Sequence, residues 1–287
     1  MKPYRLLLAL LLALPAFATH AAERIVTLAP HLAELVCAAG ACDKLVGVAR
    51  FTDEPGARGK PVVGDAFTVN VEALLALRPD LVLAWGGGTS PQFIQRLQAV
   101  GIPVRWVTVR KLDDVGNAVQ QLGGLLNTRP AADKAATAYR KRLAALREQY
   151  HGRAPLKVFY QVEVNPMFTL NDSSPISEAI RLCGGVNIFS GARKLAGPVN
   201  VESVLAAGPD VIVFGKQDMA VKIREFWKKW PLVRAVAHKQ LYEIDASTLT
   251  RQSPRVLDGV EELCKVLDTA RPVYLDLPKA DAEAKTK

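Results

Sequence analysis

The sequence predicts an α/β protein of two similar lobes, each a mostly parallel sheet flanked by helices, joined by one long bridging helix. Val-Asn-Val-Glu at residues 69–72 recurs at residues 199–202. Each copy continues into a short helix, a Pro-Asp turn and an apolar, β-rich segment, at residues 81–85 and 211–214. Apolar strands that alternate with helices are typical of a parallel sheet covered on both faces. One copy in each half favours two lobes over a single sheet.

The remaining elements follow in order along the chain. The first half opens with an expected strand at 24–28 and a helix at 32–39, followed by strands at 45–48 and 104–109 around the first repeat unit. The second half opens with an expected strand at 156–162. We therefore place an N-terminal lobe at 22–128 and a C-terminal lobe at 153–275. Residues 276–287 have no apolar period and are expected to be disordered.

The segment between the halves has the pattern of a long helix. Tyr139, Leu143, Leu146 and Tyr150 recur at helical spacing among alanines, lysines, arginines and glutamates, which favour helices. A helix of about 20 residues spans about 30 Å, enough to bridge two lobes. We place this bridging helix at 129–152. A helical crossover predicts stiff lobes with a largely pre-formed cleft between them.

The first residues have the layout of a secretory signal peptide. Lys2 and Arg5 precede an apolar run at residues 6–17, and small residues then offer cleavage after Ala18 or Ala21. The apolar run is too short to span a bilayer, and no stop-transfer pattern follows it, which disfavours the alternative of a membrane anchor. The sequence therefore predicts a signal peptide at 1–21 and an exported, periplasmic protein.

Export makes the four cysteines informative, because disulfides persist in oxidising compartments. Cys37 and Cys42 lie near each other around an expected helix end, and Cys183 and Cys264 lie in or beside apolar, helix-like stretches. Of the three possible connectivities we favour the pairs 37–42 and 183–264. Four buried, reduced thiols are the alternative. The cysteine spacing does not fit a structural zinc site.

The formal net charge of +9 raises the possibility of nucleic-acid binding. However, the basic residues are scattered and alternate with apolar or acidic ones, which indicates solvated faces, so no nucleic-acid partner is expected. An exported α/β hydrolase-like enzyme is the alternative from a different class. The sequence contains no G-x-S-x-G, H-E-x-x-H or ordered phosphate-loop motif, and we therefore expect no enzymatic activity.

Residues across the chain resemble the periplasmic cobalamin-binding proteins of ABC importers. More broadly they resemble the helical-backbone binding proteins for metal chelates, siderophores and haem. The resemblance is carried by RIVTLAPHLAEL, VNVEALLALRPDLVLAW, VNPMF, CGGVNIF and RQSPR, and it extends from about residue 24 to residue 267. It implies a class III periplasmic binding protein, a monomer without a cofactor. Such a protein binds cobalamin (vitamin B12) or a related corrinoid and delivers it to a permease dimer in the inner membrane; haem or a ferric siderophore is the alternative ligand.

The ligand cleft is expected between the lobes, at the carboxyl ends of the parallel strands. Trp85 ends its strand and matches the family's ligand-stacking tryptophan, and Gly86 opens a glycine run that lets a ligand approach the backbone. The resemblance also places Phe51, Phe168 and Arg251 on the ligand side. A core position for Trp85 and a solvated surface charge for Arg251 are the alternatives.

The sequence departs from the family pattern at three positions of the expected cleft. Ala66 and Ala196 stand where the cobalamin-binding proteins carry tryptophans, and Ser247 stands where an aspartate is expected. The loss of two large aromatic contacts weakens the ligand site unless Phe67 or another ring compensates. The ligand could therefore be a different corrinoid or another flat chelate.

Two further sets of residues are candidates for function. His31, at the start of the first helix, could be an axial ligand to cobalt or iron, with Tyr160 as a weaker alternative; a polar residue at a helix start is the other interpretation. No resident metal is expected. Glu72 and Glu202, in the two repeats, each suit the first turn of a helix. The resemblance implies that they also dock to arginines of the permease.

Overall fold

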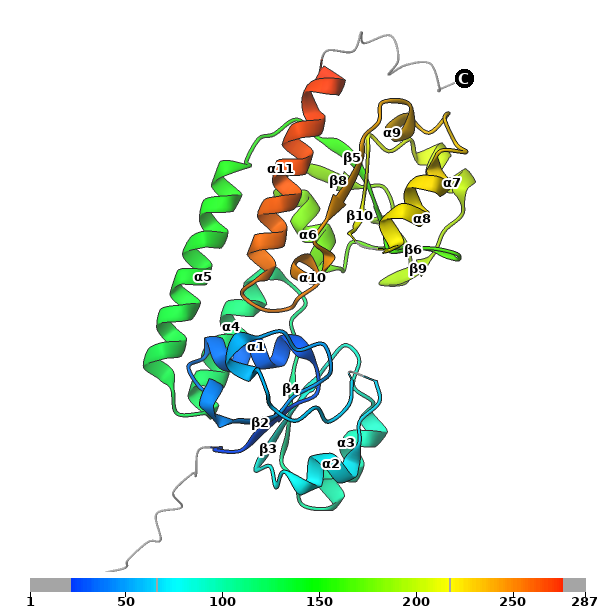
Figure 1. Ribbon diagram of the computed structural model, residues 1–287. Helices are drawn as coiled ribbons and strands as arrows, with labels where there is room; N and C mark the ends of the chain where they lie inside the picture. The colour runs from blue at the N-terminus through cyan, green and yellow to red at the C-terminus, as the bar shows by residue number, and fades with distance from the viewer. Residues whose placement is uncertain (1–21, 66, 217, 276–287) are drawn as a thin grey trace, which may run out of the picture.

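A computed structural model describes residues 22–65, 67–216 and 218–275. The expected signal peptide at 1–21 and the expected tail at 276–287 lie outside these residues, as does Ala66. Figure 1 shows the N-terminal lobe below and the C-terminal lobe above, with the long helix α5 running along one side of both. None of the helices in the part of the chain just defined is long and apolar enough to cross a membrane.

The sheet of the N-terminal lobe is parallel, with the strand order β2-β1-β3-β4. Its strands are β1 (Ile25–Thr27), β2 (Leu45–Gly47), β3 (Leu81–Trp85) and β4 (Val104–Val107). The inner strands β1 and β3 are buried almost throughout, because helices cover both faces of the sheet. The helices of this lobe are α1 (Pro30–Ala38), η1 (Cys42–Lys44), η2 (Pro55–Ala57), α2 (Val71–Ala76), α3 (Pro91–Ala99) and α4 (Leu112–Leu125).

The C-terminal lobe contains a second parallel sheet, with the order β11-β10-β5-β8. Its strands are β5 (Leu156–Gln161), β8 (Gly185–Asn187), β10 (Val211–Gly215) and β11 (Leu241–Ile244). The helices are α6 (Pro175–Leu182), α7 (Val201–Ala207), α8 (Asp218–Trp227), α9 (Arg234–Ala237), α10 (Ala246–Leu249) and α11 (Val256–Leu275). Two lobes with parallel sheets flanked by helices confirm the predicted fold class.

A small antiparallel sheet in the C-terminal lobe was not predicted from the sequence. It consists of β6 (Glu163–Val164), β7 (Met167–Leu170) and β9 (Ala196–Pro198), in the order β6-β7-β9. Its outer strands are very short, and β9 reads Ala-Gly-Pro, which has neither the alternation nor the residue types of a strand. Phe168 lies in β7, the middle strand of this sheet.

The two sequence repeats build the same local structure in the two lobes. The side chain of Asn70 caps α2 and that of Asn200 caps α7, with hydrogen bonds of 3.0 and 2.9 Å from backbone amides. Asp80 accepts hydrogen bonds of 2.8 and 2.9 Å from the backbone just before β1. Asp210 likewise accepts one of 2.7 Å from the backbone at the start of β5. The Pro-Asp turn of each repeat therefore holds the first strand of its own lobe.

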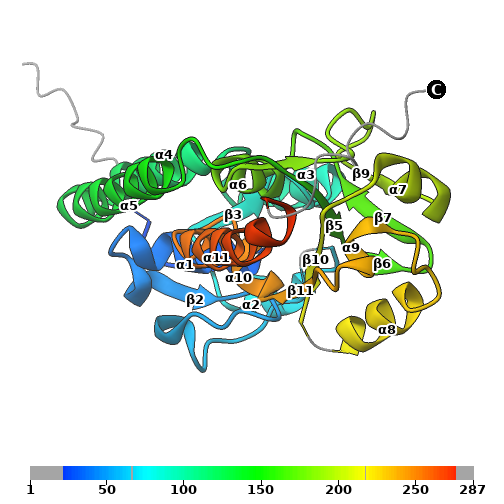
Figure 2. The ribbon, with the colours of Figure 1, turned by 90° about the horizontal axis from the view of Figure 1, so that it is seen from above.

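The bridging helix α5 spans Arg129–Gln149, so it ends slightly before the expected boundary at 152. The four apolar residues at helical spacing, from Tyr139 to the C-cap Tyr150, are all buried, as the pattern predicts. The Tyr139 hydroxyl donates a 2.7 Å hydrogen bond to the carbonyl of Leu112 at the start of α4. α4 and α5 lie side by side in Figure 2, and α5 also contacts α11 of the other lobe. One long helix is thus packed against both lobes.

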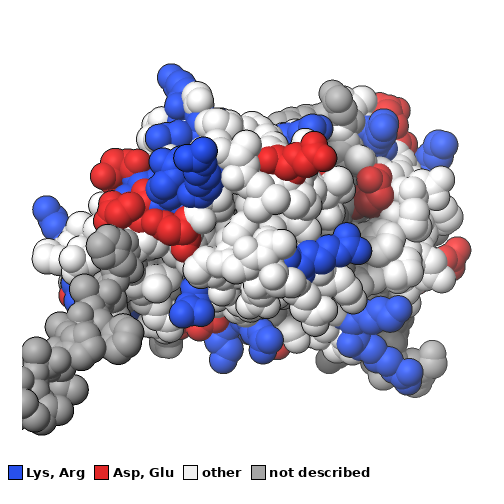
Figure 3. All heavy atoms as spheres, turned by 90° about the horizontal axis from the view of Figure 1, so that it is seen from below, with Lys and Arg blue, Asp and Glu red and all other residues white. Residues whose placement is uncertain are grey.

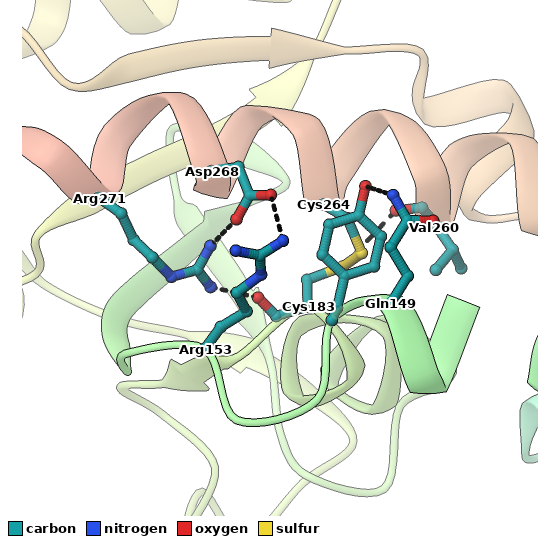
Figure 4. Close-up of a disulfide and its surroundings, with 8 residues drawn as sticks. Gln149, Arg153, Cys183, Val260, Cys264, Asp268 and Arg271 are labelled. Carbon is teal, nitrogen blue, oxygen red and sulfur yellow. Dashed lines mark hydrogen bonds and ion pairs between the residues drawn. A yellow bond between two sulfur atoms is a disulfide. The ribbon is translucent and has the colours of Figure 1, made fainter. Parts of the chain in front are cut away.

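Both predicted disulfides are present. Cys37–Cys42 joins the end of α1 to η1, and Cys183–Cys264 joins the end of α6 to α11. Both cysteines of the second disulfide are fully buried. Figure 4 shows Arg271 near the second disulfide, on the same helix as Cys264. Arg271 pairs with Asp268 and donates a 2.8 Å hydrogen bond from Nε to the carbonyl of Ala154. The disulfide and this arginine fasten α11 to the body of the C-terminal lobe.

Candidate functional site

A cavity of about 350 Å³ lies where the two lobes meet, and several predicted site residues line it. The strands β1, β2 and β3 of the N-terminal lobe end here, and the segment after β11 closes the cavity from the other side. This is the expected place, at the carboxyl ends of parallel strands. The predicted residues that line it are His31, Phe51, Trp85, Ser247 and Arg251.

Trp85 is held in place from several sides. Its indole Nε1 donates a 2.9 Å hydrogen bond to Oε1 of Gln252, and its ring meets the His31 ring edge to face at 5.5 Å between centroids. A Cβ atom on Gly87 or Gly88 would lie 2.8 or 2.3 Å from the indole. These two glycines therefore leave room for the tryptophan ring. A side chain on Gly86 would meet Thr108, which directly follows β4, so Gly86 allows the chain segments after β3 and β4 to approach each other.

His31 is a buried imidazole without a partner for Nε2 among the described residues. Burial, and secondarily the charge of Arg251, lowers the pKa of His31 to about 4. The ring is therefore neutral at neutral pH, which is the form that ligates a metal. Nε2 is covered by protein in this conformation, so ligation needs the His31 or Trp85 side chain to move.

In the ranges that the structure covers, Cys37, Cys42 and Glu54 form the one group of three His, Cys, Asp or Glu side chains whose donor atoms are close enough to share a metal. Their two sulfurs are joined in a disulfide and are therefore not thiolate ligands. Tyr160, the weaker candidate, is buried in the core, where burial raises the pKa of its hydroxyl to about 12. It does not line the cavity. His31 is thus the cavity residue best suited to hold a metal.

Arg251 is largely covered, and its charge is balanced by acidic residues of the N-terminal lobe. Its guanidinium lies 3.1 Å from Asp53 and 3.4 Å from Glu34, and Arg255 contacts the same two carboxylates at 3.0 and 3.4 Å. Burial raises the pKa of Glu34, which also accepts a hydrogen bond from the Ser253 hydroxyl. This cluster ties the segment between α10 and α11 to α1. Arg251 therefore connects the two lobes through its ion pairs and also lines the cavity.

Phe51 projects an exposed ring from a strained backbone position. Its φ angle is 65°, a conformation that is uncommon for a bulky residue and that accompanies functional sites, and 75% of the residue is exposed. Phe67, with 74% exposure, lies on a neighbouring loop, because the Arg50 amide donates a hydrogen bond to the carbonyl of Gly64. Phe67 does not line the cavity. The two rings are nevertheless available on adjoining loops of one lobe.

Phe168 and Ser247 are the remaining predicted residues of the ligand site. Phe168 is half-buried in β7, opposite Pro198 of β9, and is not among the residues that line the cavity. Ser247 lines the cavity, and its hydroxyl donates a 2.6 Å hydrogen bond to Asp245, the N-cap of α10. This hydrogen bond lowers the pKa of Asp245. Asp245 itself is not among the residues that line the cavity.

Sequence reasoning missed the partners of the cavity residues. Gln252 stands next to Arg251 in the RQSPR segment, and that adjacency was the one available signal for it. Glu34 and Asp53 contact arginines about 200 positions further along the chain, and no local pattern points to such pairs. These acidic residues partly neutralise the charge of Arg251 and so reduce its electrostatic attraction for a ligand.

The charged surface is mixed on the face of the molecule that is seen from below. Figure 3 shows lysine and arginine side chains in separate groups, interspersed with acidic side chains and separated by uncharged surface. A nucleic-acid groove needs a continuous basic track for the phosphate backbone. This face does not provide one.

Two lobes, a long connecting helix and a cavity at their boundary define a two-lobed binding protein. Residues 25–248 match the model of the family described as periplasmic binding protein, and the chain belongs to this family. It is 36% identical to the vitamin B12-binding protein of Vibrio cholerae serotype O1 over 252 residues, which cover 87% of this chain and 91% of the relative. The predicted family resemblance is therefore confirmed.

Two solved structures show the same arrangement. The periplasmic vitamin B12 binding protein BtuF of Vibrio cholerae matches with a TM-score of 0.81 at 36% identity, over 88% of this chain and 98% of that chain. The periplasmic heme-binding protein RhuT from Roseiflexus sp. RS-1 matches with a TM-score of 0.77 at 22% identity, over 86% and 98%. The second similarity shows the fold alone.

Proposed function

We propose that this protein captures cobalamin or a related corrinoid between its lobes in the periplasm. The observation that carries the proposal is the convergence of Trp85, Phe51 and His31 on one cavity, in a chain 36% identical to a protein named for vitamin B12 binding. Aromatic walls with a small number of polar groups suit a large, flat, mostly apolar ligand. The protein binds without chemistry, as a monomer without a resident cofactor or metal, and it is not an enzyme.

Delivery to an ABC permease is the second part of the proposal. Glu72 and Glu202 are exposed in the first turns of α2 and α7, which lie in different lobes (Figure 1). Neither has an ion-pair partner within the residues that the structure covers. Two free carboxylates on lobes held by one stiff helix offer a fixed spacing to arginines of a permease dimer. Each carboxylate also interacts favourably with the dipole of its helix. That interaction is enough to explain a glutamate at either position alone, but it leaves both carboxylates exposed and free to bind a partner.

Haem is the alternative ligand, and His31 is as compatible with it as with a corrinoid. His31 offers a neutral, unpartnered imidazole at the cavity, which suits a metal chelate with an open axial position. Both haem iron and the cobalt of a corrinoid without an upper ligand meet this description. A ferric siderophore, whose iron is already enclosed by oxygen donors, makes no use of His31.

Calorimetric titration of the mature protein with cyanocobalamin, cobinamide, haemin and a ferric siderophore tests the ligand class. The proposal expects saturable, stoichiometric binding of a corrinoid. Saturable binding of haemin alone, with a visible spectrum that changes in a His31→Ala variant, would replace the corrinoid by haem. Binding of the siderophore alone would contradict both ligand choices.

A further inference from the structure

A second and larger cavity, of about 720 Å³, lies between the lobes and has no role in the site described above. From the N-terminal lobe it is lined by Arg110, Lys111 and Asp113, which follow β4. From the C-terminal lobe it is lined by α6, the turn before this helix, and Leu195 next to β9. Both lobes therefore contribute walls, as they do in the first cavity.

The order of the strands relates the two cavities. The first lies where β1, β2 and β3 end and is closed by the segment after β11, an edge strand of its sheet. The second lies beyond β4, the opposite edge of the first sheet, and beside α6, which packs on β8, the opposite edge of the second. Neighbouring strands are about 4.8 Å apart, so β1 and β4 are separated by about 10 Å. Both cavities thus lie along the boundary between the lobes, beyond strand ends that are about 10 Å apart.

The acidic residues around the second cavity are already paired. Asp113 and Glu178 both contact Arg147 of α5, at 2.7 and 3.2 Å, and Asp172 pairs with Arg181. The second carboxylate oxygen of Glu178 accepts a 2.8 Å hydrogen bond from the backbone at the start of α4. The carboxylates therefore serve the junction between the lobes and α5.

Two basic residues of the cavity have no such partners. The side chains of Arg110 and Lys111 are exposed and form neither an ion pair nor a hydrogen bond with any residue in the described part of the chain. The lining carries three cations and three carboxylates, but each of these carboxylates contacts Arg147 or Arg181, so the charges of Arg110 and Lys111 are left for a ligand. An arginine next to a lysine suits a phosphate group, through the guanidinium fork and the ammonium point charge.

We propose that the second cavity receives an anionic, phosphate-bearing appendage of the ligand whose ring lies at the first cavity, and that Arg110 and Lys111 bind its charge. The inference rests on the proposed corrinoid function and deepens it. It explains how a first cavity of about 350 Å³, near the lower limit of small-molecule sites, serves a much larger ligand. Among corrinoids, cobalamin carries a phosphodiester in its nucleotide loop and cobinamide does not. Arg110 and Lys111 then favour the complete cobalamin over its truncated form.

The test compares these two ligands in calorimetric titrations of the mature protein. In the double variant Arg110→Gln, Lys111→Gln we expect the affinity for cyanocobalamin to fall about tenfold or more, because two charge-assisted contacts are lost. The affinity for dicyanocobinamide should stay within about twofold. The matched control is Lys134→Gln, Lys141→Gln, which removes two exposed charges from α5 and should leave both affinities unchanged.

A second measurement uses the unaltered protein. Raising the salt concentration screens exposed charges, so cyanocobalamin binding should weaken with salt more than dicyanocobinamide binding does. Equal losses for both ligands in the double variant, or an unchanged affinity for cyanocobalamin, would overturn the role of the second cavity while leaving corrinoid binding intact. If the unaltered protein bound neither corrinoid, the proposed function itself would fall, and this inference with it.

Discussion

The indole Nε1 of Trp85 donates a 2.9 Å hydrogen bond to the side-chain oxygen of Gln252. Trp85 ends β3 of the N-terminal lobe, whereas Gln252 follows α10, beyond the last strand of the C-terminal sheet. The contact therefore connects the two walls of the cavity and fixes the orientation of its largest ring. An aromatic wall that is already oriented loses little conformational freedom when a ligand binds.

We expect Gln252→Met to weaken corrinoid binding. The substitution keeps the length of the side chain but removes the acceptor for the indole, and one such hydrogen bond contributes about 1 kcal/mol. The affinity should fall about three- to tenfold in calorimetry, and the tryptophan fluorescence of the free protein should change. Gln98→Met, at an exposed position of α3, is the control. An unchanged affinity and an unchanged emission spectrum would show that the hydrogen bond does not position Trp85.

We expect the phenylalanine at position 51 to lower the free energy of unfolding and to strengthen ligand binding. Its φ angle of 65° is strained for a bulky residue, while its exposed ring buries little surface in the free protein. Asparagine tolerates this conformation better. Phe51→Asn should therefore raise the free energy of unfolding by up to about 1 kcal/mol and weaken corrinoid binding.

Phe51→Ala provides the comparison, because it removes the ring but keeps a side chain that disfavours this backbone conformation. Urea unfolding and calorimetry of the two variants separate the effects. Phe51→Asn should be the more stable variant, and both should bind the ligand more weakly. A loss of stability in Phe51→Asn together with unchanged affinity would contradict the assignment of this ring to the ligand.

The stability of the protein should decline in mild acid because of His31. Its pKa is about 4 in the folded state and 6.5 in the unfolded state. The unfolded chain therefore takes up the proton first, and stability is lost as the pH falls from about 6.5 towards 4. The shift of about 2.5 pH units corresponds to at most about 3 kcal/mol.

Urea unfolding at pH 7 and pH 4.5 measures this dependence. His31→Phe should lose about 2 to 3 kcal/mol less than the unaltered protein between the two pH values, because no imidazole is left to titrate. His151→Gln, at an exposed histidine, should leave the difference unchanged. Equal pH dependence in the His31 variant and the unaltered protein would show that His31 does not titrate as described.

Reversing the charges of Glu72 and Glu202 should abolish uptake without affecting ligand affinity. Both carboxylates lie outside the two cavities, and a lysine at either position would repel an arginine of the permease. Uptake of labelled cobalamin should fall in Glu72→Lys and in Glu202→Lys and be lost in the double variant. Glu148→Lys, on the exposed face of α5, is the control. If the double variant bound cobalamin more weakly, or transported it normally, the docking role would be wrong.

The sequence predicted those features of the fold that depend on local pattern. The short helix and Pro-Asp turn of each repeat and the buried spacing from Tyr139 to Tyr150 are each set by residues close together in the chain. The antiparallel sheet escaped prediction because β9, Ala196–Pro198, has no strand signal of its own and forms only against β7. Pairing between distant segments supplies the energy that such a short strand lacks.

In the candidate site too, features set by local sequence were predicted, whereas contacts between distant segments were not. Trp85, Phe51, His31 and Arg251 were predicted, since each follows a strand end or belongs to a recognisable segment, and the structure brings them to one cavity. The pairing of Arg251 with Glu34 and Asp53 could not be predicted, because it depends on how two lobes meet. The contribution of Phe67 and Phe168 to the ligand site stays a prediction.

The central claim is that a corrinoid binds at the cavity walled by Trp85. Equilibrium dialysis of the mature protein against cyanocobalamin, followed by visible absorbance, tests it directly when the unaltered protein is compared with Trp85→Ala. We predict one cobalamin bound per chain. In the variant the affinity should fall about 30-fold or more, because burial of a large aromatic ring contributes at least about 2 kcal/mol. Absence of saturable binding to the unaltered protein, or equal affinity in the two proteins, would contradict it.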